Sequence, residues 1–269
     1  LVVEMVGFVG YFKILMVNGN PLIYLEIDGE KSLQVKDSDE ILENYFAKLA
    51  AAFVRGQLID NQIPYSLSSH LLETPLDDLE VEEFAEIIQF GLATGLKLNK
   101  FKKTMGLARV QRVLGVLHGL MPNTLLDIGS GRGTFLWPLL DSLPNLKVTS
   151  VDKEEIRVMN INAVKKGGIA NISAKQLDVT ELDFEDKSFE VVTMLEVLEH
   201  IPNAQQALNQ AVRVAKNFLV LSVPSKEDNN PEHIHLFNKN SLSNMLSLAG
   251  ASSCSFDYVL NHLIVVAKI

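Results

Sequence analysis

The sequence predicts an α/β protein whose larger part is a doubly wound, mostly parallel sheet with an antiparallel last strand. From about residue 96, strand-like apolar runs alternate with helix-like runs, a pattern that buries a parallel sheet between two layers of helices. The final two strand-like runs are separated only by Leu260 and Asn261. A connection of two residues suits antiparallel neighbours and is too short for a parallel crossover.

Each element of this part is predicted from local pattern. Seven apolar or alternating runs are expected to form strands: Thr124–Gly129, Lys147–Asp152, Ile172–Asp178, Phe189–Leu195, Phe218–Val223, Ser253–Val259 and His262–Lys268. Apolar residues recur at helical spacing in four segments between the first six strands: Thr134–Ser142, Glu154–Lys166, Ala204–Ala215 and Lys239–Ala249. The segment after Asp178 is too short and acidic to be assigned.

Residues 1–95 are expected to form a smaller α+β module. Three short strand-like runs are separated by Asn18-Gly19-Asn20-Pro21 and Asp28-Gly29, residues that favour tight turns, so they predict a three-stranded meander: Phe12–Val17, Leu22–Ile27 and Ser32–Val35. Helical spacing then predicts two helices, Ser38–Arg55 with Ser38 as its cap, and Leu79–Leu92. Residues 56–78 are expected to connect them.

Charge supports a boundary between residues 95 and 96. Residues 1–95 carry 5 basic and 16 acidic side chains, a charge of minus 11, whereas residues 96–269 carry 19 basic and 17 acidic side chains, a charge of plus 2. No catalytic constellation is found in the acidic module. From its position before the larger domain, we hypothesise that it covers an acceptor site or mediates homodimer formation.

Composition excludes several classes of protein. An apolar fraction of 47% and a charged fraction of 21% exclude a disordered or fibrous chain. No run reaches the roughly 18 apolar residues that a membrane helix needs, so no membrane insertion is expected. The single cysteine, Cys254, cannot form an internal disulfide, which predicts a cytoplasmic location. A net charge of minus 9 disfavours nucleic acid as a partner, and the one basic run, Lys97 to Arg112, is interpreted as a solvated helix face.

A glycine-rich turn and an acidic residue together predict an adenosine-bearing ligand. Gly129, Gly131 and Gly133 follow the first predicted strand of the sheet and precede a helix, the place where doubly wound sheets bind ligands. Asp152 ends the second strand, 19 residues after Gly133, near the spacing at which a carboxylate accepts hydrogen bonds from a ribose diol. Asp152 as a cap of the helix that begins at Glu154 is the alternative interpretation.

The order of the glycines indicates which adenosine ligand is bound. Dinucleotide-binding turns have the pattern G-x-G-x-x-G/A, but here the pattern is G-x-G-x-G, with Thr134 at the third expected position. This disfavours a nicotinamide dehydrogenase. Asp127 lies two residues before the turn, and an acid there suits a ligand with an ammonium and a sulfonium group better than one with two phosphates.

Residues 105–269 resemble the class I S-adenosylmethionine-dependent methyltransferases. The matched positions are Asp127, Gly129, Gly131 and Gly133 of the first motif, the ribose acid Asp152, the adenine acid Asp178 with Val179 beside it, and the fourth-strand segment 189–200, which includes Leu195. The resemblance implies a Rossmann-like sheet of seven strands with a reversed last strand. It also implies that residues 96–269 bind S-adenosyl-L-methionine, with S-adenosyl-L-homocysteine as the product.

Methyl transfer needs a positioned acceptor and, in many cases, a base that removes its proton. The candidates are the acids and histidines of the loops that follow the fourth and fifth strands: Glu196, Glu199, His200, Glu232, His233 and His235. We predict His200, as general base, and Glu196 as the catalytic residues, although His200 could instead cap the next helix. Of His233 and His235, one is expected to act in the site and one to bond backbone carbonyls.

Glu196, Glu199 and His200 with His233 or His235 could also bind a divalent metal. That set resembles the one in metal-assisted O-methyltransferases of ubiquinone biosynthesis and in small-RNA 2′-O-methyltransferases. Because Glu-x-Leu-Glu-His is also found in family members for which no metal is inferred, we predict no metal.

The polar loop Val223–Phe237 is expected to form the acceptor wall, by resemblance to small-molecule and quinone-type methyltransferases. We therefore predict a small-molecule acceptor. The alternatives are an RNA-directed 2′-O-methyltransferase and a non-catalytic regulator that binds S-adenosylmethionine. Other bulky apolar or sulfur-containing residues near the motifs are assigned to core packing: Phe135, Trp137, Met159, Met194, Met245 and Cys254.

Overall fold

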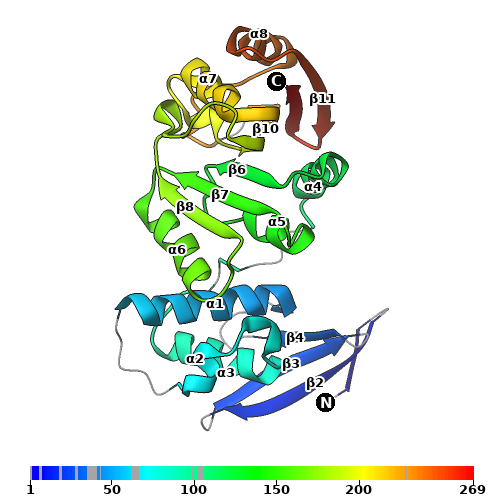
Figure 1. Cartoon of the computed structure of the whole chain (residues 1–269). Helices are drawn as coiled ribbons and strands as arrows, with labels where there is room; N and C mark the ends of the chain where they lie inside the picture. The colour runs from blue at the N-terminus through cyan, green and yellow to red at the C-terminus, as the bar shows by residue number, and fades with distance from the viewer. Residues whose placement is uncertain are drawn as a thin grey trace. The chain divides into compact units, whose positions relative to one another are not determined.

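In the computed structural model the chain forms two units (Figure 1). Side chains are described for residues 45–60, 67–98, 100–101, 106–227 and 229–269, and the backbone alone for 2–5, 8–17, 20–27, 30–34, 41–42, 44 and 61. Contacts between Cα atoms group residues 1–103 with 160–170, and residues 104–159 with 171–269. The predicted boundary after residue 95 remains a prediction.

The first unit contains an antiparallel sheet followed by helices. Its five strands pair in chain order: β1 (Val2–Met5), β2 (Phe8–Val17), β3 (Asn20–Ile27), β4 (Glu30–Gln34) and β5 (Ile41–Leu42). The helical elements are α1 (Asn44–Asn61), α2 (Ser69–Glu73), the 3-10 turn η1 (Leu76–Asp78) and α3 (Val81–Ala93). The predicted α+β character is therefore correct.

Several details of this unit differ from the prediction. The meander has five strands instead of three, and Asn20 and Pro21 belong to β3 instead of a turn. Ile41 and Leu42 pair with β4 as a strand, so the helix begins at Asn44 and not at Ser38. The remaining turn residues, Asn18, Gly19, Asp28 and Gly29, lie outside the described residues, as do Val35, Ser38, Lys102 and Lys103.

The second unit is built on a mixed sheet of seven strands in the order β11-β12-β10-β9-β6-β7-β8. The strands are β6 (Thr124–Ile128), β7 (Lys147–Asp152), β8 (Ile172–Gln176), β9 (Phe189–Leu195), β10 (Ala215–Pro224), β11 (Ser253–Val259) and β12 (His262–Lys268). Strands β6 to β10 are parallel, and β12 runs antiparallel to both β10 and β11. This confirms the predicted fold, including the reversed last strand.

Helices cover both faces of this sheet. The helices are α4 (Ala108–Leu120), α5 (Leu136–Ser142), α6 (Glu155–Lys166), α7 (Ala204–Val214) and α8 (Lys239–Ala249), and two 3-10 turns follow strands: η2 (Val179–Glu181) and η3 (Leu198–His200). Of α6, residues 155–159 belong to this unit and residues 160–166 group with the first unit. Helices α7 and α8 lie on one face, and α4 and α5 on the other (Figure 1). Successive strand residues point to opposite faces, so each strand contributes apolar side chains to both layers.

The core under α7 and α8 is apolar and continuous across the strands. It includes Leu126 of β6, Met194 of β9 and Leu221 of β10, which are fully buried. Met245 and Cys254 pack at its border, as partly buried residues. Met159, in contrast, is 53% exposed on α6, so its assignment to the core was wrong.

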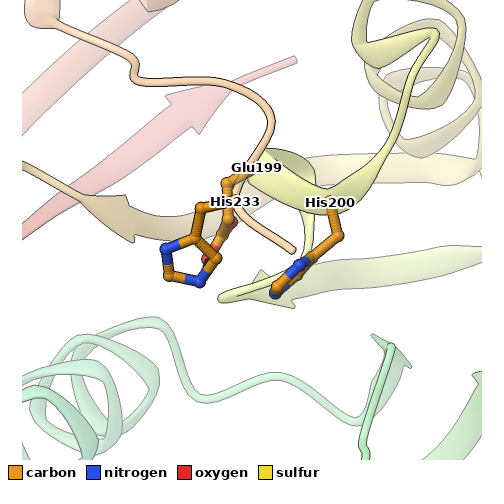
Figure 2. Close-up of side chains that lie close together, drawn as sticks. All are labelled: Glu199, His200 and His233. Atoms are coloured by element: carbon orange, nitrogen blue, oxygen red, sulfur yellow. Dashed lines mark ion pairs between the residues drawn. The ribbon is translucent and has the colours of Figure 1, made fainter. Parts of the chain in front are cut away.

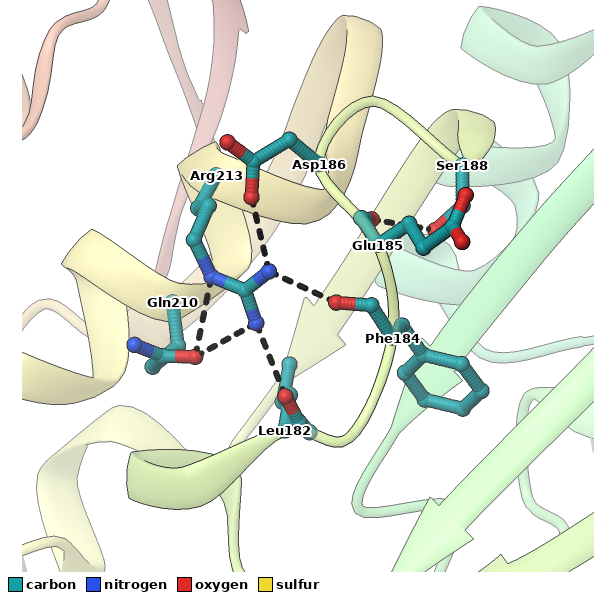
Figure 3. Close-up of polar contacts among 7 residues, drawn as sticks. All are labelled: Leu182, Phe184, Glu185, Asp186, Ser188, Gln210 and Arg213. Carbon is teal, nitrogen blue, oxygen red and sulfur yellow. Dashed lines mark hydrogen bonds and ion pairs between the residues drawn. The ribbon is translucent and has the colours of Figure 1, made fainter.

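Arg213 of α7 fixes the segment that connects β8 to β9 (Figure 3). Its guanidinium donates to the carbonyl oxygens of Phe184 and Leu182 at 2.6 and 2.8 Å and forms an ion pair with Asp186 at 2.9 Å. The side-chain oxygen of Gln210, one turn earlier on α7, accepts from the same group. These carbonyls belong to an irregular segment, so the hydrogen bonds that regular secondary structure would give them come from the Arg213 side chain instead.

Within the described residues, no helix is both long enough and apolar enough to cross a bilayer.

Candidate cofactor and acceptor site

The glycine-rich turn between β6 and α5 requires glycine at three positions for its backbone conformation, and at two of them a side chain would also clash with a neighbour. Gly129, Gly131 and Gly133 all have positive φ, at 73°, 55° and 85°, a region that favours glycine. A Cβ at Gly129 would lie 2.4 Å from the Val197 side chain, so the turn packs directly against the loop after β9. At Gly131 the nearest atom is 3.9 Å away, and this backbone is open to a ligand.

Trp137 of α5 packs directly against Gly133, the last glycine of the turn. A Cβ at Gly133 would lie 2.0 Å from the indole Nε1, and that Nε1 donates to the carbonyl of Arg132 at 3.0 Å. Trp137 is 2% exposed and Phe135 is 8% exposed. Both are buried as expected, and Trp137 also shapes the turn.

Asp152 connects the end of β7 to the glycine turn. One carboxylate oxygen, Oδ2, accepts from the backbone N–H of Gly131 at 3.1 Å, and Oδ1 accepts from the N–H of Glu154 at 3.0 Å. The second contact is the one expected of a helix cap, whereas the first joins the carboxylate to the ligand-binding turn. A carboxylate can accept about four hydrogen bonds, so both oxygens retain capacity for a ribose diol.

Asp127 at the end of β6 is buried beneath the turn. Its Oδ2 accepts from the Ser130 hydroxyl at 2.5 Å, and its Oδ1 accepts from the Thr193 hydroxyl at 2.7 Å. Burial raises the pKa of Asp127 to about 6, opposed by these two hydrogen bonds and assisted by the nearby charge of Asp152. Asp127 thus supports the turn from below as well as lining the site.

Asp178 follows β8 and caps the 3-10 turn η2. Its Oδ1 accepts from the backbone N–H and the hydroxyl of Thr180, at 2.8 and 2.7 Å, and these bonds hold the pKa of Asp178 below its usual value. Among the described residues, its other oxygen, Oδ2, accepts no hydrogen bond. Val179, the next residue, is buried and lines the same cavity as Asp178.

Two cavities open at the edge of the sheet where the parallel strands end. The larger, of about 620 Å³, is lined by Asp152, Leu177, Asp178, Val179, Val197, His200 and Glu232 among others. The smaller, of about 160 Å³, is lined by Arg109, Asp127, Ser130, Arg132, Leu195 and Ser222 among others. Gly129, Gly131 and Glu196 line both cavities, so the two meet at the glycine turn.

Arg109 is a site residue that the sequence analysis did not assign. It lies in the first turn of α4, a helix that was not predicted as an element, and only its place in the basic run was noticed. Apolar spacing at Val110, Val113, Leu114 and Leu117 was the signal that could have found the helix. Its neighbour in the basic run, Arg112, forms an ion pair with Asp257 at 2.6 Å.

The predicted residues of the loop after β9 lie at the cavities. Leu195 lines the smaller cavity and Glu196 lines both. His200 lines the larger one, where its Nδ1 lies 2.9 Å from the carbonyl oxygen of Glu232. Because a carbonyl only accepts, Nδ1 carries the proton, and Nε2 of the neutral ring is therefore an acceptor. That tautomer can receive a proton from an acceptor molecule.

Glu199, His200 and His233 form a cluster whose potential ligand atoms lie within 4.8 Å of one another (Figure 2). Glu199 is completely buried, and one of its carboxylate oxygens lies 4.0 Å from Nε2 of His233. The two imidazole rings meet edge to face with centroids 4.8 Å apart. One carboxylate and two imidazoles are a donor set that suits a divalent transition metal.

The other two candidates of the metal set lie elsewhere. Nε2 of His235 is 3.0 Å from the carbonyl of Ile201, the kind of backbone contact expected of one histidine in this loop. Glu196 contacts Ser222 and His262 instead of the cluster. The structure therefore brings together three of the five residues that the sequence offered as metal ligands.

Three features define the class I S-adenosylmethionine-dependent methyltransferases. They are the seven-stranded sheet with a reversed last strand, the glycine turn after the strand β6, and the acids at the carboxyl ends of β7 and β8. A family model described as a methyltransferase domain matches residues 123–261, and the chain belongs to this family.

Two relatives and one solved structure are similar to parts of the chain. A ubiquinone/menaquinone biosynthesis C-methyltransferase of Brucella abortus is 28% identical over 35% of this chain and 36% of its own length. A ubiquinone biosynthesis O-methyltransferase of Rickettsia prowazekii is 36% identical over 40% of this chain and 41% of its own length. The match thus spans about a third of the first of these relatives.

A S-adenosylmethionine-dependent methyltransferase structure from Aquifex aeolicus has a TM-score of 0.51 and 22% identity, covering 61% of this chain and 92% of that protein. This likeness shows the fold.

Proposed function

We propose that this protein is an S-adenosylmethionine-dependent methyltransferase that acts on a small-molecule acceptor. The observation that carries the proposal is the meeting of two cavities at one glycine turn, with Asp152 and Asp178 on one side and Arg109 on the other. S-adenosylmethionine has the matching parts, an adenosine and a charged methionine joined at a sulfonium. The names of the quinone-biosynthesis relatives support the same activity.

The proposed pose places adenosine in the larger cavity. The ribose hydroxyls would donate to Asp152, and the adenine amino group would donate to Asp178 with Val179 against the ring. The methionine part would enter the smaller cavity, where its carboxylate suits the Arg109 guanidinium. The open backbone of Gly131 allows the ligand to cross between the two cavities.

The chemistry we propose is an in-line displacement. A lone pair of the acceptor attacks the methyl carbon, the carbon–sulfur bond breaks, and its electron pair stays on sulfur to give S-adenosylhomocysteine. His200 Nε2 would take the acceptor proton, which the tautomer set by Glu232 permits. The main contribution of the enzyme is to hold the acceptor in line with the methyl group.

A metal at the Glu199–His200–His233 cluster is a second candidate role, favoured by the closeness of the three donor groups. The buried carboxylate and two imidazoles would hold the ion, which would act as a Lewis acid on an acceptor hydroxyl. Calorimetric titration with Mn²⁺ and Zn²⁺ tests this role. Saturable binding that is lost in Glu199→Gln would support it, and no heat in the unaltered protein would exclude both ions.

We propose a small molecule as the acceptor because the polar loop of residues 225–237 borders the site, with Glu232 in the larger cavity, and because the similar proteins are named for quinone synthesis. Among the residues that the structure describes, no contact favours RNA, and Arg112 of the basic run already pairs with Asp257. A homodimer, a covering role for residues 1–95 and a cytoplasmic location remain predictions.

The test combines binding and transfer. The full chain would be titrated with S-adenosylmethionine in a calorimeter and then incubated with the methyl-labelled cofactor and a cell extract divided into low-mass and RNA fractions. We expect binding, with label transferred to the low-mass fraction. Label in RNA alone would support the RNA-directed alternative, binding without transfer would support a regulator, and absence of binding would overturn the proposal.

A further inference from the structure

Glu196, Ser222 and His262 form a polar group at the ends of three neighbouring strands. One oxygen of Glu196, Oε1, accepts from the Ser222 hydroxyl at 2.6 Å. The other, Oε2, lies 3.0 Å from Nδ1 of His262. Nδ1 is buried and, among the described residues, makes no hydrogen bond of regular geometry, so this second contact is a close approach of two polar atoms.

The topology explains how residues so far apart in sequence meet. Glu196 follows β9, and Ser222 faces the end of that strand in the parallel pair with β10. Strand β12 is antiparallel, so its first residue, His262, lies at the edge where the parallel strands end, opposite Pro224. The reversed strand thereby brings an imidazole to the ligand-binding edge of the sheet.

Glu196 has a backbone conformation that is costly for a residue with a side chain. Its φ is 57°, in the left-handed region, and its N–H donates to the carbonyl of Ser222 at 2.9 Å. Such a conformation is retained where the surrounding structure enforces it, and these positions cluster in functional sites. The constraint holds Glu196 at the junction of the two cavities, both of which it lines.

We propose that Glu196 makes the site distinguish the charged methyl donor from its neutral product, and that Ser222 and His262 limit the negative potential of Glu196. This inference rests on the proposed function. The donor carries a positive sulfur where the two cavities meet, and this charge disappears when the methyl group leaves. A carboxylate at that junction therefore stabilises bound donor over bound product and favours product release.

Ser222 and His262 limit how strongly Glu196 favours the donor. The positive charge on sulfur is already decreasing in the transition state. A carboxylate without neighbouring polar groups would therefore stabilise the donor more than the transition state and slow the transfer. A hydroxyl donor on one oxygen and an imidazole beside the other reduce that effect. The variants that test the proposal leave the other charged groups of the smaller cavity in place: Asp127, Arg109 and Arg132.

Calorimetric titration of the full chain with S-adenosylmethionine and S-adenosylhomocysteine tests the proposal without knowledge of the acceptor. The measured quantity is the Kd for the product divided by the Kd for the donor. We expect this ratio to fall at least about threefold in Glu196→Gln and to rise at least about threefold in Ser222→Ala and His262→Leu. His118→Leu, an exposed histidine outside both cavities, is the matched control and should leave the ratio unchanged.

A merely structural role would weaken both ligands equally. Equal changes in both Kd values, or an unchanged ratio in Glu196→Gln, would overturn the proposal. If His262→Leu does not fold, the smaller change Ser222→Ala decides the contribution of the partners. Failure of the unaltered protein to bind either ligand would instead contradict the proposed function, so the two failures are distinguishable.

Discussion

Replacement of Asp152 by alanine tests the binding of the ribose most directly. In the structure its carboxylate accepts from Gly131 at 3.1 Å and from Glu154 at 3.0 Å, and it faces the larger cavity. The substitution removes the acceptor that the proposal assigns to the two ribose hydroxyls. It also removes one support of the glycine turn, so binding and folding must be measured together.

The expected loss of affinity follows from the number of bonds. A hydrogen bond to a charged group contributes about 1.5 to 3 kcal/mol, so two of them contribute about 3 to 6 kcal/mol. At about 1.4 kcal/mol for each factor of ten, the Kd for S-adenosylmethionine should increase at least about 100-fold. Asp152→Asn keeps one acceptor oxygen for the Gly131 N–H and should show a smaller loss.

Isothermal titration calorimetry gives the Kd values, and thermal unfolding of each variant without ligand shows whether the fold is retained. Asp183→Ala, which changes an exposed acid outside the cavities, is the control and should bind as the unaltered protein does. A Kd for Asp152→Ala within about threefold of the original would refute the ribose role. A folded variant with the full loss would support it.

Three further results are expected. The pKa of Asp127 is raised from 3.8 to about 6, so the folded state binds the carboxyl proton more tightly than the unfolded chain does. This binding contributes stability that is complete below pH about 4 and is lost as the pH rises through about 6. The urea-derived unfolding free energy of Asp127→Asn, relative to the original, should therefore rise by roughly 3 kcal/mol between pH about 4 and about 7, and a constant difference would contradict the assignment. His200→Ala should lower turnover about 100-fold or more with little change in donor Kd, and comparable losses in both would indicate a structural role. Gly133→Ala should destabilise the protein by about 2 kcal/mol more than Gly131→Ala, because only the former places a methyl group 2.0 Å from the Trp137 indole; denaturant unfolding that finds equal losses would disprove this.

Local pattern was sufficient for the elements of the second unit that have strong periodicity. The bounds of β7, β9, β11, β12 and α8 coincide with the prediction. Helix α4 was missed despite its regular apolar spacing, because Gly115 and Gly119 lower its helix propensity and no capping side chain marks its start. In the first unit, Ile41 and Leu42 fit a helical pattern equally well, and pairing with β4 decided the outcome.

The site was predictable where its residues follow one strand, and less so where distant strands meet. Asp152 and Asp178 both line the larger cavity because Asp152 ends the parallel strand β7 and Asp178 lies two residues after the parallel strand β8. The contact of Glu196 with His262 depends on β12 lying antiparallel beside β10, a pairing that spacing within the sequence does not specify. Likewise, only the packed structure shows why Gly133 must be glycine, since the reason is the indole four residues later.

The same indole has a practical consequence. Trp137 is the sole tryptophan of the chain, and its ring nitrogen bonds to the backbone of the glycine turn. Its emission spectrum should therefore respond to occupancy of the nucleotide pocket, giving an unlabelled optical signal with which ligand libraries can be screened and binding rates followed in a stopped-flow instrument.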